Sequence, residues 1–246
     1  MRRFLVRPEQ LAAQSAEIDG DLYRHISKVL RLKIGDRIKL FDGTGRESAA
    51  TISRLGNRNL TVTLETTAIP VPTRSAPVIT LIQGLPKGEK LDLIIQKATE
   101  LGAHSIIAFP AARSVVRIPP AQIEQRISRW QRIAGEAARQ SQRSSVPRLS
   151  FAPDLAAALA QADLPTKLLL WEGERECRLK ETLALSPPPT GVVILVGPEG
   201  GLTDEEAASA VVGGFVSVSL GPRILRTETA GLAMLAILQY QWGDMG

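Results

Sequence analysis

Two Gly-Pro turns near the C-terminus gather most of the residues in this chain that could do chemistry. The first turn, residues 197–201 (GPEGG), directly follows the apolar run VVILV. The second, Gly221-Pro222, follows the alternating run FVSVSL and precedes RILRTET. Each turn stands between a predicted strand and the start of a predicted helix. That layout is typical of a ligand pocket at the carboxyl end of parallel strands.

The first turn combines glycines, which let a backbone approach a ligand closely, with acidic residues. Thr203 and Glu206 have the spacing of a capping box that opens a helix. Glu199 inside the turn and the acidic residues 204–206 would oppose a phosphate at the helix start. The motifs GxxxxGK[ST] and GxGxxG are both absent. The pattern therefore favours an uncharged or cationic ligand and speaks against a dinucleotide-dependent oxidoreductase.

The second turn brings two arginines, Arg223 and Arg226, to the start of the last helix. Thr227 or Thr229 is predicted to cap that helix. The segment AGLAMLAILQYQ is apolar nearly all round, so it should be buried within its domain or against a second subunit. Two tight turns without a ligand are the alternative, but the paired turns and arginines favour a cleft.

The elements before these turns alternate as strand, helix and strand. VITLIQG (78–84) and SIIAF (105–109) read as strands, and EKLDLIIQKATEL between them reads as a helix with Gly102 as its C-cap. This is a β-α-β unit with parallel strands. Lys87, Gly88 and Lys90 fall in its first loop, where ligands commonly bind, although alone they are a weak signal.

Residues 1–70 have a different rhythm, with the short candidate strands RFLV, DRIKLF, SAATIS and NLTVTLE. One helix, LYRHISKVLRL, should place Leu22, Ile26, Val29 and Leu30 on one face. The pattern predicts a small β-barrel or sandwich. Residues 71–77 read as a stiff, proline-containing linker, which leaves 78–246 as a second domain.

The net charge of +5 is concentrated in two regions, which indicates a polyanionic partner such as RNA. In the helix predicted over 120–143, arginines gather on one face, and arginine suits phosphate oxygens well. Solvated surface charge is the alternative. The candidate RNA-binding residues are Arg2, Arg7, Arg24, Lys28, Arg31, Arg129, Arg132, Arg139 and Arg143.

Several classes of protein are excluded or disfavoured by composition. The single cysteine, Cys177, excludes an intramolecular disulfide, and no Cys/His spacing suggests a metal site. The apolar stretch 232–238 is too short to span a bilayer, and the start of the chain does not read as a secretory signal. We expect a cytoplasmic protein without a metal and without a membrane partner.

The motifs GPEGGLTDEE and LGPRILRTETA closely resemble the RsmE family, the 16S ribosomal RNA uracil-N3 methyltransferases of the SPOUT (α/β-knot) superfamily. The resemblance covers nearly all of the chain. HISKVLRLKIGDRIKLFDGTG resembles the family's PUA-like domain, KGEKLDLIIQKATELG its first catalytic-domain helix, and RWQRIAGEAARQSQR its long arginine helix.

This resemblance implies an α/β protein with an N-terminal PUA-like β-barrel and a C-terminal SPOUT domain. The SPOUT domain should have a mostly parallel sheet and a deep trefoil knot. It also implies a homodimer, 16S rRNA of the small ribosomal subunit as substrate, and S-adenosylmethionine as methyl donor. The residues that it implies around the donor are Trp171, Glu172, Gly197, Pro198, Glu199, Gly200, Gly201, Leu220, Gly221, Pro222, Leu225, Thr227 and Thr229.

Methylation at uracil N3 requires loss of a proton, so a nearby cation and base would help. Arg226 is the first choice for the cation and Arg223 the second, while Glu228 and Glu199 are candidate bases. Either glutamate could instead shape its loop or helix start, with solvent taking the proton. Two alternatives stay open: a non-catalytic RNA-binding or ribosome-assembly factor, and methylation at another RNA position such as a ribose 2′-O.

Overall fold

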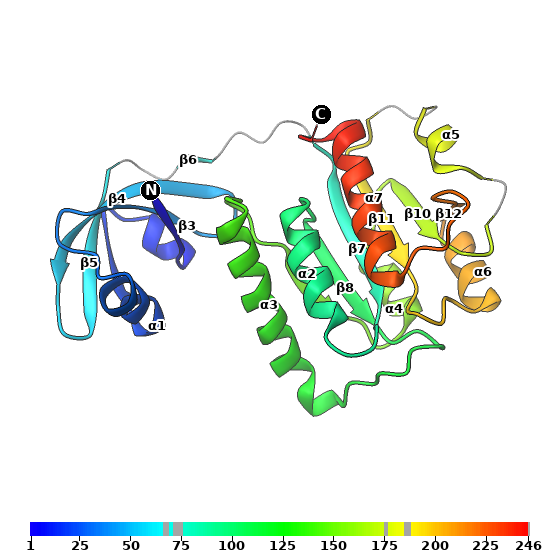
Figure 1. The fold of residues 1–246 in the computed structure, drawn as a ribbon, viewed down its shortest axis with the longest axis horizontal. Coiled ribbons are helices and arrows are strands. Elements are labelled where there is room, and N and C mark those ends of the chain that lie inside the picture. Colours follow the sequence, from blue (N-terminus) through cyan, green and yellow to red (C-terminus); the bar gives the residue numbers. More distant parts are fainter. Residues whose placement is uncertain (66–68, 71–75, 175–176, 185–187, 246) are drawn as a thin grey trace. The chain divides into compact units, whose positions relative to one another are not determined.

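The computed structural model describes residues 1–65, 69–70, 76–174, 177–184 and 188–245. It divides into two compact units (Figure 1). The first unit comprises Met1–Pro72 together with Ala138–Val146, and the second comprises Thr73–Ala137 and Pro147–Gly246. The inclusion of residues 138–146 in the first unit was not predicted. Most of the predicted linker, residues 71–75, lies outside the described residues.

The first unit is built on one six-stranded sheet in the order β1-β3-β4-β5-β2, with β6 pairing to β4. All of its pairings are antiparallel except β1 with β3. The second strand was missed, although Ala16 and Ile18 are buried between exposed neighbours and follow the two-residue period of a strand. The strands are β1 (Arg2–Leu5), β2 (Ser15–Asp19), β3 (Arg37–Phe41), β4 (Arg46–Leu55), β5 (Asn59–Leu64) and β6 (Ile69–Pro70).

The helix predicted in this unit is split, and one residue predicted on its buried face is exposed. An α-helix, α1 (Gly20–Arg24), continues into a π-helical turn, His25–Val29. There Leu30 N donates to His25 O at 2.9 Å, a five-residue spacing. The wider turn shifts later side chains around the axis. Ile26 is consequently buried, whereas the Val29 side chain is 67% exposed.

The second unit is built on a six-stranded sheet in which every pairing is parallel, as expected for alternating strands and helices. The order is β12-β10-β11-β7-β8-β9, and all six residues of β11 are buried. The predicted mostly parallel sheet is confirmed. Its strands are β7 (Val78–Gly84), β8 (Ser105–Phe109), β9 (Arg148–Phe151), β10 (Thr166–Leu170), β11 (Gly191–Val196) and β12 (Val216–Val218).

Helices cover both faces of this sheet. On one face α2 (Lys90–Glu100) and α7 (Thr227–Trp242) pack side by side (Figure 1). On the other, α4 (Leu155–Ala160) and α6 (Asp204–Val212) share a core with Ile82 and Val193. Alternate side chains of β7 therefore pack against helices on opposite faces of the sheet. The remaining helices are α3 (Ile123–Gln140), α5 (Leu179–Ala184) and the 3₁₀ turns Pro8–Leu11 and Pro120–Gln122.

The last helix, α7, is buried along one side and exposed along another. Met234, Leu235 and Leu238 are fully buried, whereas Ile237 is 37% and Tyr240 71% exposed. Burial inside its own domain thus accounts for part of its apolar surface. The predicted homodimer and the predicted trefoil knot both stay predictions.

Two other classes of site have no counterpart among the described residues. None of the described helices combines the length and apolar character needed to cross a bilayer. Within the same residues, no group of three or more His, Cys, Asp or Glu side chains could hold a metal ion.

Candidate functional site: a cavity at the carboxyl edge of the parallel sheet

A cavity of about 930 Å³ lies in the second unit, where β10, β11 and β12 end. Its walls are the segments that follow these three strands, together with Lys90 at the start of α2. Because the strands are parallel, their carboxyl ends meet at one edge of the sheet, where α/β proteins bind ligands. Its size is in the range of small-molecule sites.

Most of the predicted site residues line this cavity. They are Trp171, Glu172, Gly197, Pro198, Glu199, Gly201, Leu220, Gly221, Pro222, Arg223, Leu225, Arg226 and Thr227. The other three are neighbours of lining residues: Gly200 belongs to the same turn, Glu228 is the second residue of α7, and Thr229 is exposed one residue later. The structure thus brings the two Gly-Pro turns to one place, as their layout predicted.

Residues 197–202, here called the glycine loop, pack tightly against the end of β7. A Cβ atom at Gly84 would lie 2.7 Å from Pro198 N, so only glycine fits there. At the other end of the loop, Thr203 Oγ1 accepts from Glu206 N at 3.1 Å, and Glu206 Oε2 accepts from Thr203 N at 2.9 Å. The predicted capping box is confirmed, and it holds the loop at the start of α6.

A buried polar network joins the glycine loop to β7 and α7. Thr227 Oγ1 donates to Gly197 O at 2.6 Å and accepts from Gln83 Nε2 at 2.9 Å. Gln83 is fully buried and also donates to Gly84 O at 3.0 Å. The prediction that Thr227 or Thr229 caps α7 is wrong, because Arg226 is the N-cap and the Thr227 hydroxyl serves the loop instead.

Sequence reasoning missed Gln83, although it is the one strongly polar side chain near the end of the apolar run VITLIQG. A buried amide in a strand costs free energy unless it is hydrogen-bonded, so its presence is itself a signal of a specific network.

Lys90, which lines the cavity, contacts both predicted bases. Its Nζ lies 2.9 Å from Glu199 Oε1 and 3.3 Å from Glu228 Oε2. Glu199 also accepts from Lys87 N at 3.1 Å, and Arg226 Nη1 lies 3.9 Å from Glu228 Oε1. The sequence placed Lys90 in a ligand-facing loop but could not show its partners, which come from segments more than 100 residues away.

These contacts set the ionisation of two of the groups. The hydrogen bond to Glu199, opposed by burial and aided by Glu228, raises the pKa of Lys90 above its usual value. Burial alone would raise the pKa of Glu199, but the hydrogen bonds from Lys90 and the Lys87 backbone outweigh it and lower that pKa. Both groups are therefore charged at neutral pH.

The outer side of the glycine loop is held by residues that follow β8. Arg113 Nη1 donates to Gly200 O at 3.1 Å, and Ala112 N donates to Glu206 Oε1 at 2.8 Å. The contact between Arg113 and the glycine loop joins residues 87 positions apart and has no local signature in the sequence. The role of Arg113 in holding this loop comes from tertiary packing.

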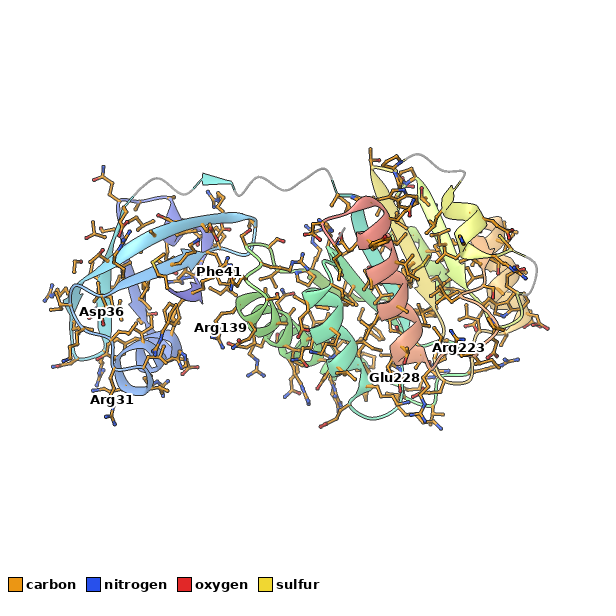
Figure 2. The ribbon with its side chains drawn as sticks, turned by 45° about the horizontal axis from the view of Figure 1, so that its top comes forward. Arg31, Asp36, Phe41, Arg139, Arg223 and Glu228 are labelled. Carbon is orange, nitrogen blue, oxygen red and sulfur yellow. The ribbon has the colours of Figure 1, made fainter. Side chains whose placement is uncertain are left out.

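Residues 219–226, here called the arginine loop, form the opposite wall and are open to solvent. The side chain of Ile224 is 82% exposed and that of Arg226 is 83% exposed. Figure 2 shows Glu228 at the start of α7 and Arg223 in the loop that leads to it. Cationic groups and one apolar side chain are thus available to a partner that approaches the cavity from outside.

The predicted RNA-binding residues fall into two groups. Arg2, Arg7, Arg24, Lys28 and Arg31 belong to the first unit and are exposed, Arg31 with a positive φ of 52° (Figure 2). Arg24 lies 2.6 Å from Asp21.

The predicted arginine stripe of α3 is not uniform. Arg129 and Arg132 are exposed in the second unit, and Arg129 pairs with Asp92. Arg139 and Arg143 are half-buried, and they belong to the segment that packs with the first unit. The helix predicted over 120–143 ends at Gln140, so Arg143 lies beyond it, and periodicity could not show that this end of the chain has different neighbours.

Comparison with known proteins gives consistent matches along the chain. The profile of an RNA methyltransferase domain matches residues 73–239, and that of an RNA methyltransferase PUA domain matches residues 18–65. The ribosomal RNA small subunit methyltransferase E of Bacillus subtilis is 35% identical over 98% of this chain and 97% of its own length. That of Mycobacterium bovis is 32% identical over 92% of this chain and 88% of its own.

A solved structure agrees with these matches. The ribosomal RNA small subunit methyltransferase E of Neisseria gonorrhoeae, bound to S-adenosyl methionine, has a TM-score of 0.87 and 33% identity, with all of both chains covered.

Proposed function

Because the chain belongs to the ribosomal RNA small subunit methyltransferase E family, we propose that it transfers a methyl group from S-adenosylmethionine to RNA of the small ribosomal subunit. The observation that carries this proposal is the cavity at the carboxyl edge of the parallel sheet, with its glycine loop and arginine loop. The match to a PUA domain and the exposed cationic residues of the first unit support an RNA substrate.

The residues around the cavity fit S-adenosylmethionine. Leu170, Val196, Val218 and Leu220 offer apolar surface suited to an adenine ring, and Glu172 lines the cavity with a carboxylate that would complement a positively charged ligand. A Cβ atom at Gly201 would lie 2.7 Å from Glu172 Oε1, so the carboxylate of Glu172 packs directly against this glycine. When bound, the donor supplies a methyl group on a positively charged sulfur.

The proposed acceptor is N3 of a specific uridine in 16S rRNA. Methylation there replaces the N3 proton, so negative charge spreads onto the two flanking carbonyl oxygens as the proton leaves. Arg226, which is exposed at the lip of the cavity, is the proposed cation for that charge, with Arg223 second. The glycine loop and the arginine loop hold the two reactants together, which by itself contributes much of the rate.

The proposal includes a homodimer and a cytoplasmic location. Exposed apolar side chains on α7, with Ile237 37% and Tyr240 71% exposed, support a second copy as the partner. Tyr240→Glu should shift sedimentation from dimer to monomer; a wild-type protein that sediments as a monomer at all concentrations would overturn the dimer.

The test is a pair of measurements on the full chain. Calorimetric titration of the wild-type protein with S-adenosylmethionine should show binding, and its absence would favour a non-catalytic assembly factor. Mass-spectrometric mapping of 16S rRNA from cells that lack the protein should show loss of one N3-methyluridine. Loss of a ribose methylation instead would identify the alternative enzymatic activity.

A further inference from the structure

Four charged side chains follow one another with alternating sign at the cavity: Glu199, Lys90 and Arg226 line it, and Glu228 lies between Lys90 and Arg226. They come from three separate segments, the glycine loop, the start of α2 and the start of α7 with its N-cap. Nζ of Lys90 is the centre of the series, at 2.9 Å from Glu199 and 3.3 Å from Glu228. Lys90 lines the cavity and its side chain is only 34% exposed, so this ion cluster calls for a functional explanation.

We propose that Lys90 is a positioning residue for methyl transfer, which fastens the glycine loop to the start of α7 and holds Glu199 and Glu228 as its counter-ions, so that neither glutamate takes the substrate proton. This inference rests on the proposed function. It replaces the two candidate bases from the sequence with a structural ion cluster.

Without the ammonium group of Lys90, the two glutamates would have no shared cation. Oxygen atoms of both glutamates lie within 3.3 Å of one nitrogen atom, so removal of the ammonium group would leave two carboxylates close together at a partly buried place. The side chain of Glu228 is only 16% exposed, so solvent screens this repulsion poorly. The glycine loop and the start of α7 would then move apart.

The second step concerns proton transfer. Both carboxylate oxygens of Glu199 accept from Lys87 N, at 3.1 and 3.2 Å, and Oε1 also contacts Lys90. These bonds lower the pKa of Glu199, against the effect of burial, and a base works best when its pKa is near the working pH. Taking a proton would break contacts that hold the loop.

The third step gives the proton another route. The lip of the cavity is open, with Arg226 83% exposed and Ile224 82% exposed. A proton that leaves uracil N3 there can pass to water, while the guanidinium group of Arg226 stabilises the negative charge left on the base. Proton and charge are thereby accounted for without a protein base.

The experiment compares Lys90→Met with Lys97→Met in the full chain. Lys97 is a matched control, because it lies in the same helix and pairs with one glutamate, Glu100, at 2.8 Å on the surface. Calorimetry should show donor binding about tenfold weaker for Lys90→Met, and its unfolding temperature should fall. Lys97→Met should change donor affinity by less than about twofold. Equal behaviour of the two variants would overturn the inference.

Two further variants separate charge from fold. Lys90→Arg keeps the cation and should stay within about threefold of the wild-type donor affinity. The double variant Lys90→Met with Glu199→Gln removes one of the two repelling charges and should bind the donor better than Lys90→Met alone. If Lys90→Arg is as weak as Lys90→Met, pairing of charges is not the cause.

The proton is tested by Glu199→Gln and Glu228→Gln in single-turnover methylation at saturating donor. Loss of a general base costs on the order of 10²–10⁴ in rate, whereas loss of a counter-ion should cost less than about tenfold. A hundredfold fall with unchanged donor binding in either variant would contradict the inference. Wild-type protein that fails to bind the donor would instead contradict the proposed function, so the two failures are distinct.

The pH–rate profile gives a readout that a merely structural role would not move. The charged groups around Lys90 are Glu199, Glu228 and, beyond Glu228, Arg226. In Lys90→Met the two carboxylates face each other without a cation, so lowering the pH should relieve their repulsion and the pH–rate profile should differ from that of the wild type. An identical profile in both proteins would count against the cluster.

Discussion

The glycine loop and the arginine loop line the same cavity, but the rest of the chain holds them in opposite ways. The glycine loop is fastened on every side: by Thr227 at Gly197 O, by Lys90 at Glu199 and by Arg113 at Gly200 O. The arginine loop presents exposed side chains, among them Ile224 and Arg226. The first arrangement suits a small donor that needs one fixed wall. The second suits a large substrate that brings its own surface.

The two walls should therefore respond differently to substitution. Changes that affect the glycine loop should alter stability and donor binding together. Changes in the arginine loop should alter RNA binding or the chemical step while the fold and the donor affinity stay as they are.

The largest effect is expected from Arg226→Ala in the arginine loop. Removal of a group that stabilises developing negative charge costs on the order of 10²–10³ in rate, so single-turnover methylation at saturating donor should fall by about a hundredfold. Donor affinity by calorimetry should stay within about twofold. Arg226→Lys, which keeps a cation, should be less impaired; a near-normal rate for Arg226→Ala would show that another group carries this role.

The next largest effect is expected from Thr227→Val, which should act through the glycine loop. The substitution keeps the shape but leaves Gly197 O and Gln83 with fewer partners in a buried place, which costs about 1–3 kcal/mol. For a chain of this size that is a fall of about 2–4 °C in unfolding temperature per kcal/mol, measurable by calorimetry. Donor binding should weaken as well.

Thr227→Ser is the matched control for that prediction, because it keeps the hydroxyl group. It should recover most of the stability and donor affinity. A valine variant as stable as wild type would mean that the loop does not depend on this network.

Ile224→Ser should have a moderate effect confined to the RNA. Because the side chain is 82% exposed, its loss should change the stability by no more than about 0.5 kcal/mol. If it packs against the substrate, KM for RNA should rise severalfold while donor affinity is unchanged. Val212→Ser, on a side chain 91% exposed away from the cavity, is the control and should leave KM unaltered.

The smallest effect is expected from pH. The pKa of Glu199 is lowered from 4.5, so its contribution to stability is present above that value and is lost as pH falls through the folded pKa. The pKa of Lys90 is raised from 10.5, so its contribution is present below that value and is lost as pH rises through the folded pKa. Glu199 and Lys90 therefore both keep their charges from about pH 5.5 to about 9, and the donor affinity of the wild type should be nearly constant over that range. A marked change of affinity inside it would show that another group titrates at the cavity.

Local sequence patterns predicted much of the second unit because each depends on neighbouring residues. The apolar run VVILV without alternation predicted a strand buried on both faces, and β11 is that strand. Thr203 and Glu206 are three residues apart, so their capping box could be seen in the sequence. Gly102 after a run with helical spacing was predicted as the C-cap of α2; the C-cap is Leu101, and Gly102 follows it with a φ of 88°.

Tertiary structure decided the roles that depend on distant partners. Val29 has the spacing of a buried helix position, but it is exposed because the helix there makes a π-helical turn. The side-chain pattern does not predict that turn. Thr227 could have capped its helix, yet a carbonyl group 30 residues away takes its hydroxyl. Arg139 shares a face with Arg129 in the helix but has other neighbours, because the chain returns there to the first unit.

By itself the sequence indicated many of the residues that line the cavity, since the two Gly-Pro turns follow strands whose carboxyl ends meet at one sheet edge. Only the tertiary structure shows what Glu199 and Glu228 contact there. Their types allow either a base or a counter-ion, and the choice depends on whether a cation lies within hydrogen-bonding distance. Folding of α2 against α7 brings Lys90 to that distance, which residue spacing along the chain does not encode.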